Sequence, residues 1–288
     1  MRSLLFLLVL FTHAIAAEPS SGPEKGSLFI HGGGRLTGVQ IAEFIRLAGG
    51  PEARFVIIPS ALEGDTWGDD HARRGFLARH GVKDVRMLHT RDREVADSAA
   101  FVEPLQQAQG VWFEGGRQWR LADAYLGTRT EVEFHNVLKR GGVIGGSSAG
   151  ATIQGSYLVR GAPEGNHIMM ARGHEQGFGF IKHAAIDQHV IKRKRQRDLL
   201  EVIGARPELL GLGIDEDTAL IVEGNRARVL GASSVLVYDR KLIVPDAAEP
   251  YLTLSADQVL DLKERTISDA PAKEIGAPQS AAPGGAAP

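Results

Sequence analysis

The stretch GVIGGSSAGA, residues Gly142–Ala151, decides the fold of this 288-residue chain. It joins a short apolar run to a segment of helical character, and it spaces Gly146, Ser148 and Gly150 as in a nucleophile elbow. Small flanking residues leave room for a sharp turn that presents a serine hydroxyl above the end of a sheet. The Ala149 N–H and the helix N-terminus would then point to the place where an oxyanion forms. The alternative interpretation is a phosphate-binding turn or a plain strand–helix connection.

Short apolar runs alternate with amphipathic segments on both sides of this stretch. Strands are expected at Leu28–His31, Phe55–Pro59, Val85–His89, Val111–Glu114, Gly142–Gly146, Ala184–His189, Ala219–Val222 and Val235–Tyr238. Helices are expected at Gly38–Ala48, Trp67–Arg79, Gln118–Leu126, Glu131–Arg140 and Lys192–Ile203. Alternation over the first two-thirds predicts an α/β fold with a doubly wound, mostly parallel sheet. The strand-rich last third (RARVLG, SVLVYD, YLTLSA) predicts C-terminal antiparallel strands at one edge.

Glycines follow three of the expected strands, at Gly32–Gly34, Gly115–Gly116 and Gly145–Gly146. Open α/β sheets bind ligands at the carboxyl ends of their strands, where bare backbone can approach a substrate. Each glycine group alone could simply allow a tight turn. Together they indicate a shared functional edge.

A serine nucleophile needs a base, and the base needs an orienting acid. All ten histidines lie at or before His189, which ends the strand that closes with Asp187-Gln188-His189. Acidic residues stand beside it at Asp187 and further on at Asp215-Glu216-Asp217. Spacing alone does not choose the orienting acid among these four carboxylates.

His31-Gly32-Gly33-Gly34 resembles the oxyanion loop of lipases and esterases. That fold takes its histidine from near the C-terminus, after the serine and the acid. No histidine follows His189 in this chain, so an α/β-hydrolase assignment lacks its base.

The two chain ends carry little that could form a core. Residues 1–16 combine Arg2, the apolar run Leu4–Phe11 and the small-x-small site Ala14–Ala16, which predicts a signal peptide and an exported protein, periplasmic or extracellular. Residues 268–288 are rich in Ala, Pro and Gly and predict a disordered tail. One domain over residues 25–267 is expected between them.

Composition narrows the function classes further. The formal charge is −2, so no global attraction to nucleic acid or anionic membranes is expected. The chain has no cysteine, which excludes disulfides, thiol catalysis and a lipid-attachment cysteine. No phosphate loop, zinc-type histidine pair or dinucleotide fingerprint occurs, so neither a metal nor a cofactor is expected.

Four segments together resemble peptidase family S51, especially its cyanophycinase branch. They are GGSSAGA (Gly145–Ala151), DQH (Asp187–His189), GLGIDEDTAL (Gly211–Leu220) and EGGRQ (Glu114–Gln118). The resemblance covers about residues 27 to 240. It implies a fold like the class I glutamine amidotransferases (flavodoxin-like), with serine in place of their cysteine, and it implies a homodimer.

The resemblance also implies roles for individual residues. The implied catalytic residues are Ser148, His189 and Glu216, and the implied oxyanion-hole residues are Gly115, Gly116 and Ala149. The implied substrate-binding residues are Gln118, Asp187, Gln188, Arg193 and Arg195. At a third arginine position of the family this chain has Asp198, with Arg197 beside it.

The basic run Lys192–Arg197 bears on the substrate. Arginines near a site can hold substrate carboxylates with a bidentate fork, although part of the run would only be a solvated helix face. Together with these residues, the resemblance implies a metal-free serine exopeptidase acting on cyanophycin or related β-aspartyl or Asp-rich peptides. The alternatives are an aspartyl dipeptidase of the same family and a catalytically silent protein that binds acidic peptides.

Overall fold

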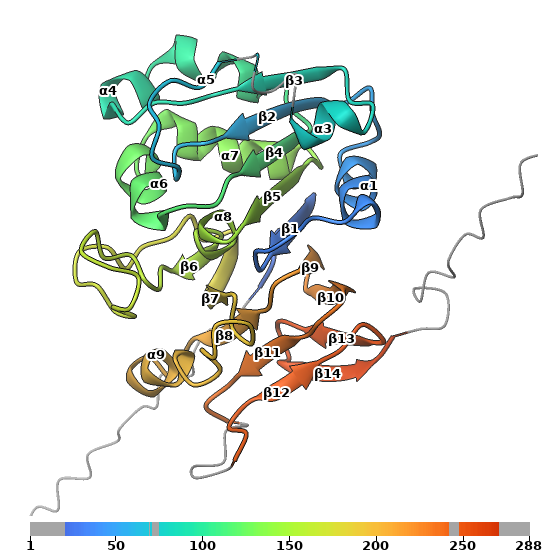
Figure 1. Cartoon of the computed structure of the whole chain (residues 1–288), viewed down its shortest axis with the longest axis vertical. Coiled ribbons are helices and arrows are strands. Elements are labelled where there is room, and N and C mark those ends of the chain that lie inside the picture. Colours follow the sequence, from blue (N-terminus) through green and yellow to red (C-terminus); the bar gives the residue numbers. More distant parts are fainter. Residues whose placement is uncertain (1–20, 69, 71–74, 242–247, 271–288) are drawn as a thin grey trace, which may run out of the picture.

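A computed structural model describes residues 21–68, 70, 75–241 and 248–270 of the chain (Figure 1). The expected signal peptide, residues 1–16, lies outside the described residues, as does the expected tail beyond residue 270. No helix within the described ranges is long and apolar enough to cross a membrane.

The larger sheet has nine strands among the described residues, in the order β14-β13-β10-β9-β1-β5-β4-β2-β3 (Figure 1). Their bounds are β1 (Ser27–His31), β2 (Arg54–Ile58), β3 (Asp84–Met87), β4 (Gly110–Phe113), β5 (Val143–Ser147), β9 (Thr218–Glu223), β10 (Arg226–Gly231), β13 (Gln258–Asp261) and β14 (Thr266–Asp269). β1, β5, β4, β2 and β3 pair in parallel. The remaining four strands extend the β1 side with antiparallel pairs. The carboxyl ends of β1, β4 and β5 therefore meet at one edge.

Alternating side chains of the parallel strands cover both faces of this sheet. On β1, Leu28 and Ile30 belong to one buried cluster and Phe29 to another, as the two-residue period of a strand requires. One face carries α1 (Gly38–Leu47) and α3 (Phe76–Arg79). The other carries α4 (Arg93–Ala96), α5 (Ala99–Gln106), α6 (Gln118–Tyr125), α7 (Arg129–Lys139) and α8 (Ala149–Thr152) (Figure 1).

A second sheet of five strands packs below the first, in the order β12-β11-β8-β7-β6 (Figure 1). Its strands and its helix are β6 (Gly155–Tyr157), β7 (Ile181–Gln188), β8 (Leu210–Ile214), β11 (Val235–Tyr238), β12 (Leu252–Leu254) and α9 (Leu199–Ala205). β6, β7 and β8 are parallel, whereas β11 and β12 are antiparallel additions.

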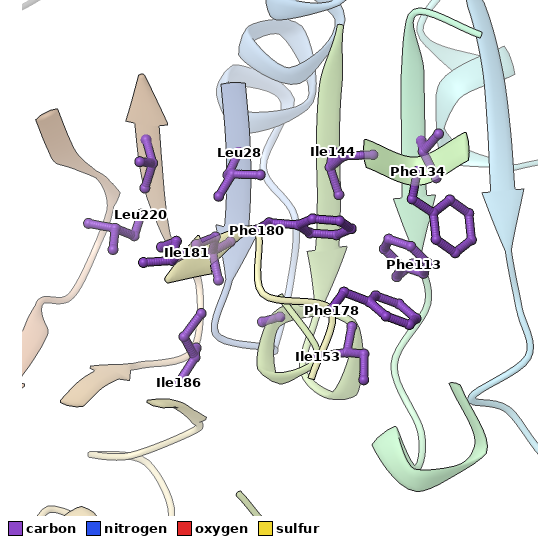
Figure 2. Close-up of a cluster of buried hydrophobic side chains, with 14 of the residues drawn as sticks. Leu28, Phe113, Phe134, Ile144, Ile153, Phe178, Phe180, Ile181, Ile186 and Leu220 are labelled. Atoms are coloured by element: carbon purple, nitrogen blue, oxygen red, sulfur yellow. The ribbon is translucent and has the colours of Figure 1, made fainter. Parts of the chain in front are cut away.

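Aromatic side chains join the two sheets. Figure 2 shows Phe178 and Phe180, which precede β7, beside Phe113 of β4 and Phe134 of α7. The ring centroids of Phe113 and Phe178 lie 5.5 Å apart, and those of Phe134 and Phe178 also lie 5.5 Å apart. Because these rings anchor the start of β7 in the main core, they fix where the end of β7 emerges.

The predicted fold class is confirmed, a mostly parallel α/β sheet with antiparallel strands toward the C-terminus. The eight predicted strands are present with ends shifted by a few residues. The sequence did not predict that the strand ending at His189 belongs to a separate sheet.

Three boundaries differ from the prediction. The expected helix Lys192–Ile203 is wrong over its first half, because residues 192–198 form turns and α9 begins at Leu199. Of the expected helix Trp67–Arg79, α3 covers Phe76–Arg79, and residues 69 and 71–74 lie outside the described ranges. The first residues of the tail expected from residue 268 belong to a strand instead, because Ser268 and Asp269 of β14 pair with β13 through backbone hydrogen bonds that need no apolar side chain.

Candidate active site

Ser148 occupies a strained turn between β5 and α8. Its backbone angles are φ 55° and ψ −110°, a conformation that non-glycine residues rarely adopt and that is found at functional sites. The turn needs its flanking glycines, since a Cβ on Gly146 would lie 2.3 Å from the Gly150 carbonyl oxygen. The Ser148 N–H donates to the His31 carbonyl oxygen at 3.0 Å. Strand pairing and close backbone packing thus hold this serine in a nucleophile-elbow conformation.

The Ser148 hydroxyl meets an imidazole that is itself bound to a carboxylate. Ser148 Oγ lies 2.8 Å from His189 Nε2, and His189 Nδ1 lies 2.7 Å from Glu216 Oε1. His189 directly follows β7 in the smaller sheet, and Ser148 follows β5 in the larger one. Glu216 lies in the Asp215–Asp217 turn that leads from β8 of one sheet to β9 of the other. The three side chains can therefore act as nucleophile, base and orienting acid at the junction of the two sheets.

The other three carboxylates that the spacing allowed as the orienting acid contact groups other than the imidazole. Asp215 Oδ1 accepts from the backbone N–H groups of Ile191 and Lys192 at 3.0 and 2.9 Å. Asp217 Oδ1 accepts from the Arg35 N–H at 2.5 Å. Asp187 is fully buried and accepts a hydrogen bond from the Arg160 guanidinium. Among the four, Glu216 is the carboxylate that contacts the imidazole.

The glycines after His31 enclose the histidine and the acid of this array. A Cβ on Gly33, whose φ is +111°, would lie 2.0 Å from His189 Cε1. A Cβ on Gly34 would lie 3.0 Å from Glu216 Cβ, and the Gly32 carbonyl accepts from the His189 N–H at 3.0 Å. The His31–Gly34 segment thus packs around the base. The sequence alone did not reveal this role.

Gly33→Ala is expected to lower kcat roughly 100-fold, since a catalytic group displaced by about 1 Å costs that much. The added methyl group would overlap the imidazole, and alanine would also be strained at this φ. Steady-state kinetics with circular dichroism measures the effect. Gly38→Ala is the matched control, because a Cβ at Gly38 meets nothing within 4 Å. Wild-type turnover in Gly33→Ala would show that this glycine does not position His189.

The expected oxyanion-hole residues follow β4 (Gly115 and Gly116) and the nucleophile (Ala149). A Cβ on Gly115 would lie 3.4 Å from Ser148 Cβ, so this residue adjoins the nucleophile. Gly116 has φ +135°, and its backbone packs against Ala61, whose carbonyl oxygen would lie 2.2 Å from an added Cβ. Within the described part of the chain, the N–H groups of Gly115, Gly116 and Ala149 donate to no protein acceptor. They remain available to a developing negative charge.

The pKa of His189 is lowered from the ordinary histidine value. Burial is the largest cause, and repulsion from Arg193 and Arg195 acts in the same direction. The hydrogen bond to Glu216 acts in the opposite direction, because it favours the imidazolium. His189 is therefore neutral at neutral pH and able to accept the Ser148 proton.

The acid limb of the kcat/KM profile is expected to have its midpoint below about 6.5, where the neutral base is lost. Arg193→Gln should move this midpoint to higher pH, since removing a nearby cation makes the imidazolium easier to form. Arg197 is an exposed arginine of the same basic run; Arg197→Gln removes the same charge and should leave the midpoint unchanged. A midpoint that stays fixed or falls in Arg193→Gln would contradict this electrostatic account.

The expected substrate-binding side chains differ in how deeply they are buried. Gln118 and Gln188 are buried: Gln118 Nε2 donates to the Val159 carbonyl oxygen at 2.9 Å, and Gln188 Oε1 accepts from Arg195 at 3.5 Å. Arg193 is more exposed, and its Nε lies 3.9 Å from Glu216 Oε1. The structure therefore gathers Gln188 and both arginines beside the Ser–His–Glu array.

Asp187 and Asp198 share one partner that the sequence did not suggest. Arg160, buried in the segment between β6 and β7, forms a bidentate pair with Asp187 at 2.8 and 2.9 Å and donates to Asp198 at 2.6 Å. No local sequence signal marks Arg160, since the contacts join residues 27 and 38 positions apart. Among the described residues, no group of three or more His, Cys, Asp or Glu side chains is placed to hold a metal.

Known proteins show similar sequences and folds. Residues 28–230 match the model of peptidase family S51. A cyanophycinase from Geminocystis herdmanii is 31% identical over 224 residues, which cover 75% of this chain and 81% of the relative. A cyanophycinase from Synechococcus elongatus is 32% identical over 226 residues, which cover 75% of this chain and 68% of the relative.

Two solved structures share the fold. A peptidase from an acI-B1 actinobacterium superposes with a TM-score of 0.64 at 23% identity, covering 83% of this chain and 98% of that structure. A putative peptidase E from Listeria monocytogenes gives a TM-score of 0.51 at 15% identity, covering 72% and 99%. The family match spans the strands and turns that carry Ser148, His189 and Glu216. The chain is therefore a serine peptidase and belongs to peptidase family S51.

Proposed function

We propose that the protein is an exopeptidase that hydrolyses cyanophycin or related β-aspartyl peptides through an acyl-enzyme on Ser148. The observation that carries the proposal is the continuous chain of contacts from Ser148 Oγ through His189 to Glu216. The substrate class is supported by the relatives named cyanophycinase and by the arginines beside the array.

The chemistry begins when His189 Nε2 accepts the Ser148 proton and Oγ attacks the scissile carbonyl carbon. The N–H groups near Gly115 and Ala149 would stabilise the resulting oxyanion, and Glu216 would stabilise the imidazolium. His189 then gives its proton to the leaving amine, and an ester forms on Ser148. A water activated by the same imidazole hydrolyses this ester and restores the enzyme.

Arg193 and Arg195 are proposed to hold a carboxylate of the substrate, with Gln118 and Gln188 lining the same pocket. Guanidinium groups bind carboxylates through two parallel hydrogen bonds, which suits an aspartyl residue. Asp187, which is fully buried, would act on the substrate indirectly.

A substrate panel tests the proposal. The purified protein is incubated with cyanophycin, β-Asp-Arg, Asp-Arg and Asp-Leu, and the products are identified by mass spectrometry. Release of dipeptides from cyanophycin, without larger internal fragments, is expected. Cleavage of Asp-Leu and Asp-Arg alone would favour the aspartyl dipeptidase of the same family. No cleavage, together with no reaction at Ser148, would favour a silent binding protein.

Export and dimer formation also belong to this proposal. Export is supported by the leader pattern in residues 1–16, and the homodimer by the family resemblance. Expression of the full chain in a bacterium, followed by fractionation and intact-mass measurement, should give a product outside the cytoplasm that lacks the leader. Sedimentation analysis of that product should give twice the chain mass.

A further inference from the structure

Arg160 is a buried arginine with an unusual set of partners. Its side chain is 2% exposed, and its backbone φ of 56° is rare for a non-glycine residue. Its N–H groups donate to both oxygens of Asp187, to Asp198 Oδ2 and to the Asn166 carbonyl oxygen. Its backbone N–H donates to the Met169 carbonyl oxygen at 3.0 Å. The loop between β6 and β7 thus inserts one fixed guanidinium between two carboxylates.

Both carboxylates interact electrostatically with Arg195. Asp198 follows Arg195 by three residues, and its backbone N–H donates to the Arg195 carbonyl oxygen at 3.0 Å. Asp187 adjoins Gln188, whose Oε1 accepts from Arg195 Nη1 at 3.5 Å. The pKa of Arg195 is lowered mainly by burial and then by repulsion from Arg160, whereas Asp187 and Asp198 act to raise it. Arg195 therefore lies within electrostatic reach of the whole cluster.

Arg195 nevertheless forms no ion pair with a carboxylate in the described part of the chain. A half-buried guanidinium beside two carboxylates would ordinarily pair with one of them. In this protein, Arg160 already donates hydrogen bonds to both oxygens of Asp187 and to one oxygen of Asp198. Within the described ranges, the Arg195 guanidinium makes one hydrogen bond, to Gln188 Oε1, which leaves most of its N–H donors unused.

We propose that Arg160 is a positioning residue that keeps Asp187 and Asp198 from pairing with Arg195, so that the Arg195 guanidinium stays open to a substrate carboxylate. The inference rests on the proposed role of Arg195 in substrate binding. It also gives Asp198, which stands at the third arginine position of the family, a partner. The negative charge of Asp198 is compensated by the Arg160 guanidinium from the β6–β7 loop. It also explains how the buried Asp187 affects the substrate without touching it.

The test compares Arg160→Met with Arg160→Met/Asp198→Asn. In Arg160→Met, the released carboxylates capture Arg195, so KM should rise about tenfold or more while kcat changes little. Removing the Asp198 charge in the double variant should bring KM a large part of the way back to the wild-type value. A double-mutant cycle measures this coupling between Arg160 and Asp198. Arg54→Met is the matched control, because Arg54 pairs with Asp84 at the surface, at the far edge of the main sheet.

A second readout does not require hydrolysis. The rate at which a small uncharged phosphonate labels Ser148 is measured, together with the concentration of free aspartate that halves this rate. Arg160→Met should be labelled at the wild-type rate but need about tenfold more aspartate for protection. If the wild type is labelled and protected but cleaves none of the peptides, the proposed substrate fails while this inference stands.

An unchanged KM and unchanged aspartate protection in Arg160→Met would overturn the inference. So would a loss of labelling in step with the loss of turnover, since Arg160 would then only support His189. If Arg160→Met does not fold, Arg160→Lys decides, because lysine keeps the charge but cannot pair with both oxygens of Asp187 at once. A rise of KM in Arg160→Lys that Asp198→Asn relieves supports the inference, and a wild-type KM overturns it.

Discussion

Ser148→Ala is expected to lower kcat by roughly four to six orders of magnitude, because a nucleophile and its base act as one unit. The hydroxyl that His189 Nε2 contacts at 2.8 Å is the group that would form the acyl bond, and alanine has no hydroxyl. The fold should persist, since the substitution removes one oxygen and leaves every backbone contact of the elbow in place. Steady-state kinetics with the peptide substrate measure the loss of kcat. Thermal unfolding of the wild type and of Ser148→Ala shows whether the fold persists.

Ser147→Ala is the control for that variant. Ser147 Oγ faces His31 Nδ1 at 3.1 Å rather than the imidazole of His189. Losing this hydrogen bond should cost about 1 kcal/mol of stability and little turnover. If Ser147→Ala abolished hydrolysis and Ser148→Ala retained it, the nucleophile would have been misassigned.

Glu216→Gln is expected to lower kcat by about 10³- to 10⁴-fold with a modest change in KM. The Glu216 carboxylate holds the His189 proton on Nδ1 and stabilises the imidazolium. A glutamine can turn its NH₂ group toward Nδ1, which would place the proton on Nε2 and block proton transfer from Ser148. Kinetics across pH measures the loss, and circular dichroism confirms that the variant is folded.

Asp187→Asn provides the contrast to Glu216→Gln. It should mainly raise KM, because Asp187 pairs with Arg160, whereas the carboxylate that contacts Nδ1 of His189 belongs to Glu216. The opposite pattern, with Asp187→Asn nearly inactive and Glu216→Gln close to wild type, would identify Asp187 as the orienting acid.

The parallel core could be predicted because its signals are local. Apolar, β-branched runs such as Leu28–His31 and Val111–Glu114 are too short for helices and are bounded by glycine, as buried strands are. The nucleophile elbow around Ser148 could be predicted for the same reason, because the tight turn requires glycine at fixed spacing.

The site could be predicted less completely, since several contacts depend on tertiary packing. The run Lys192–Arg197 has helical composition, yet the Asp215 carboxylate binds the N–H groups of Ile191 and Lys192 and holds the chain in turns. The pairing of Arg160 with Asp187 and Asp198 joins a loop to another sheet element and leaves no periodic signal. Which acid faces His189 followed from the family resemblance and not from spacing.

Covalent trapping of Ser148 tests the central claim most directly. The purified protein is treated with a serine-reactive phosphonate, digested and sequenced by mass spectrometry. The account predicts one adduct on Ser148, loss of hydrolysis in proportion to labelling, and no adduct in Ser148→Ala. Full hydrolytic activity in protein that carries the adduct, or an adduct on another residue that accounts for the lost activity, would contradict it.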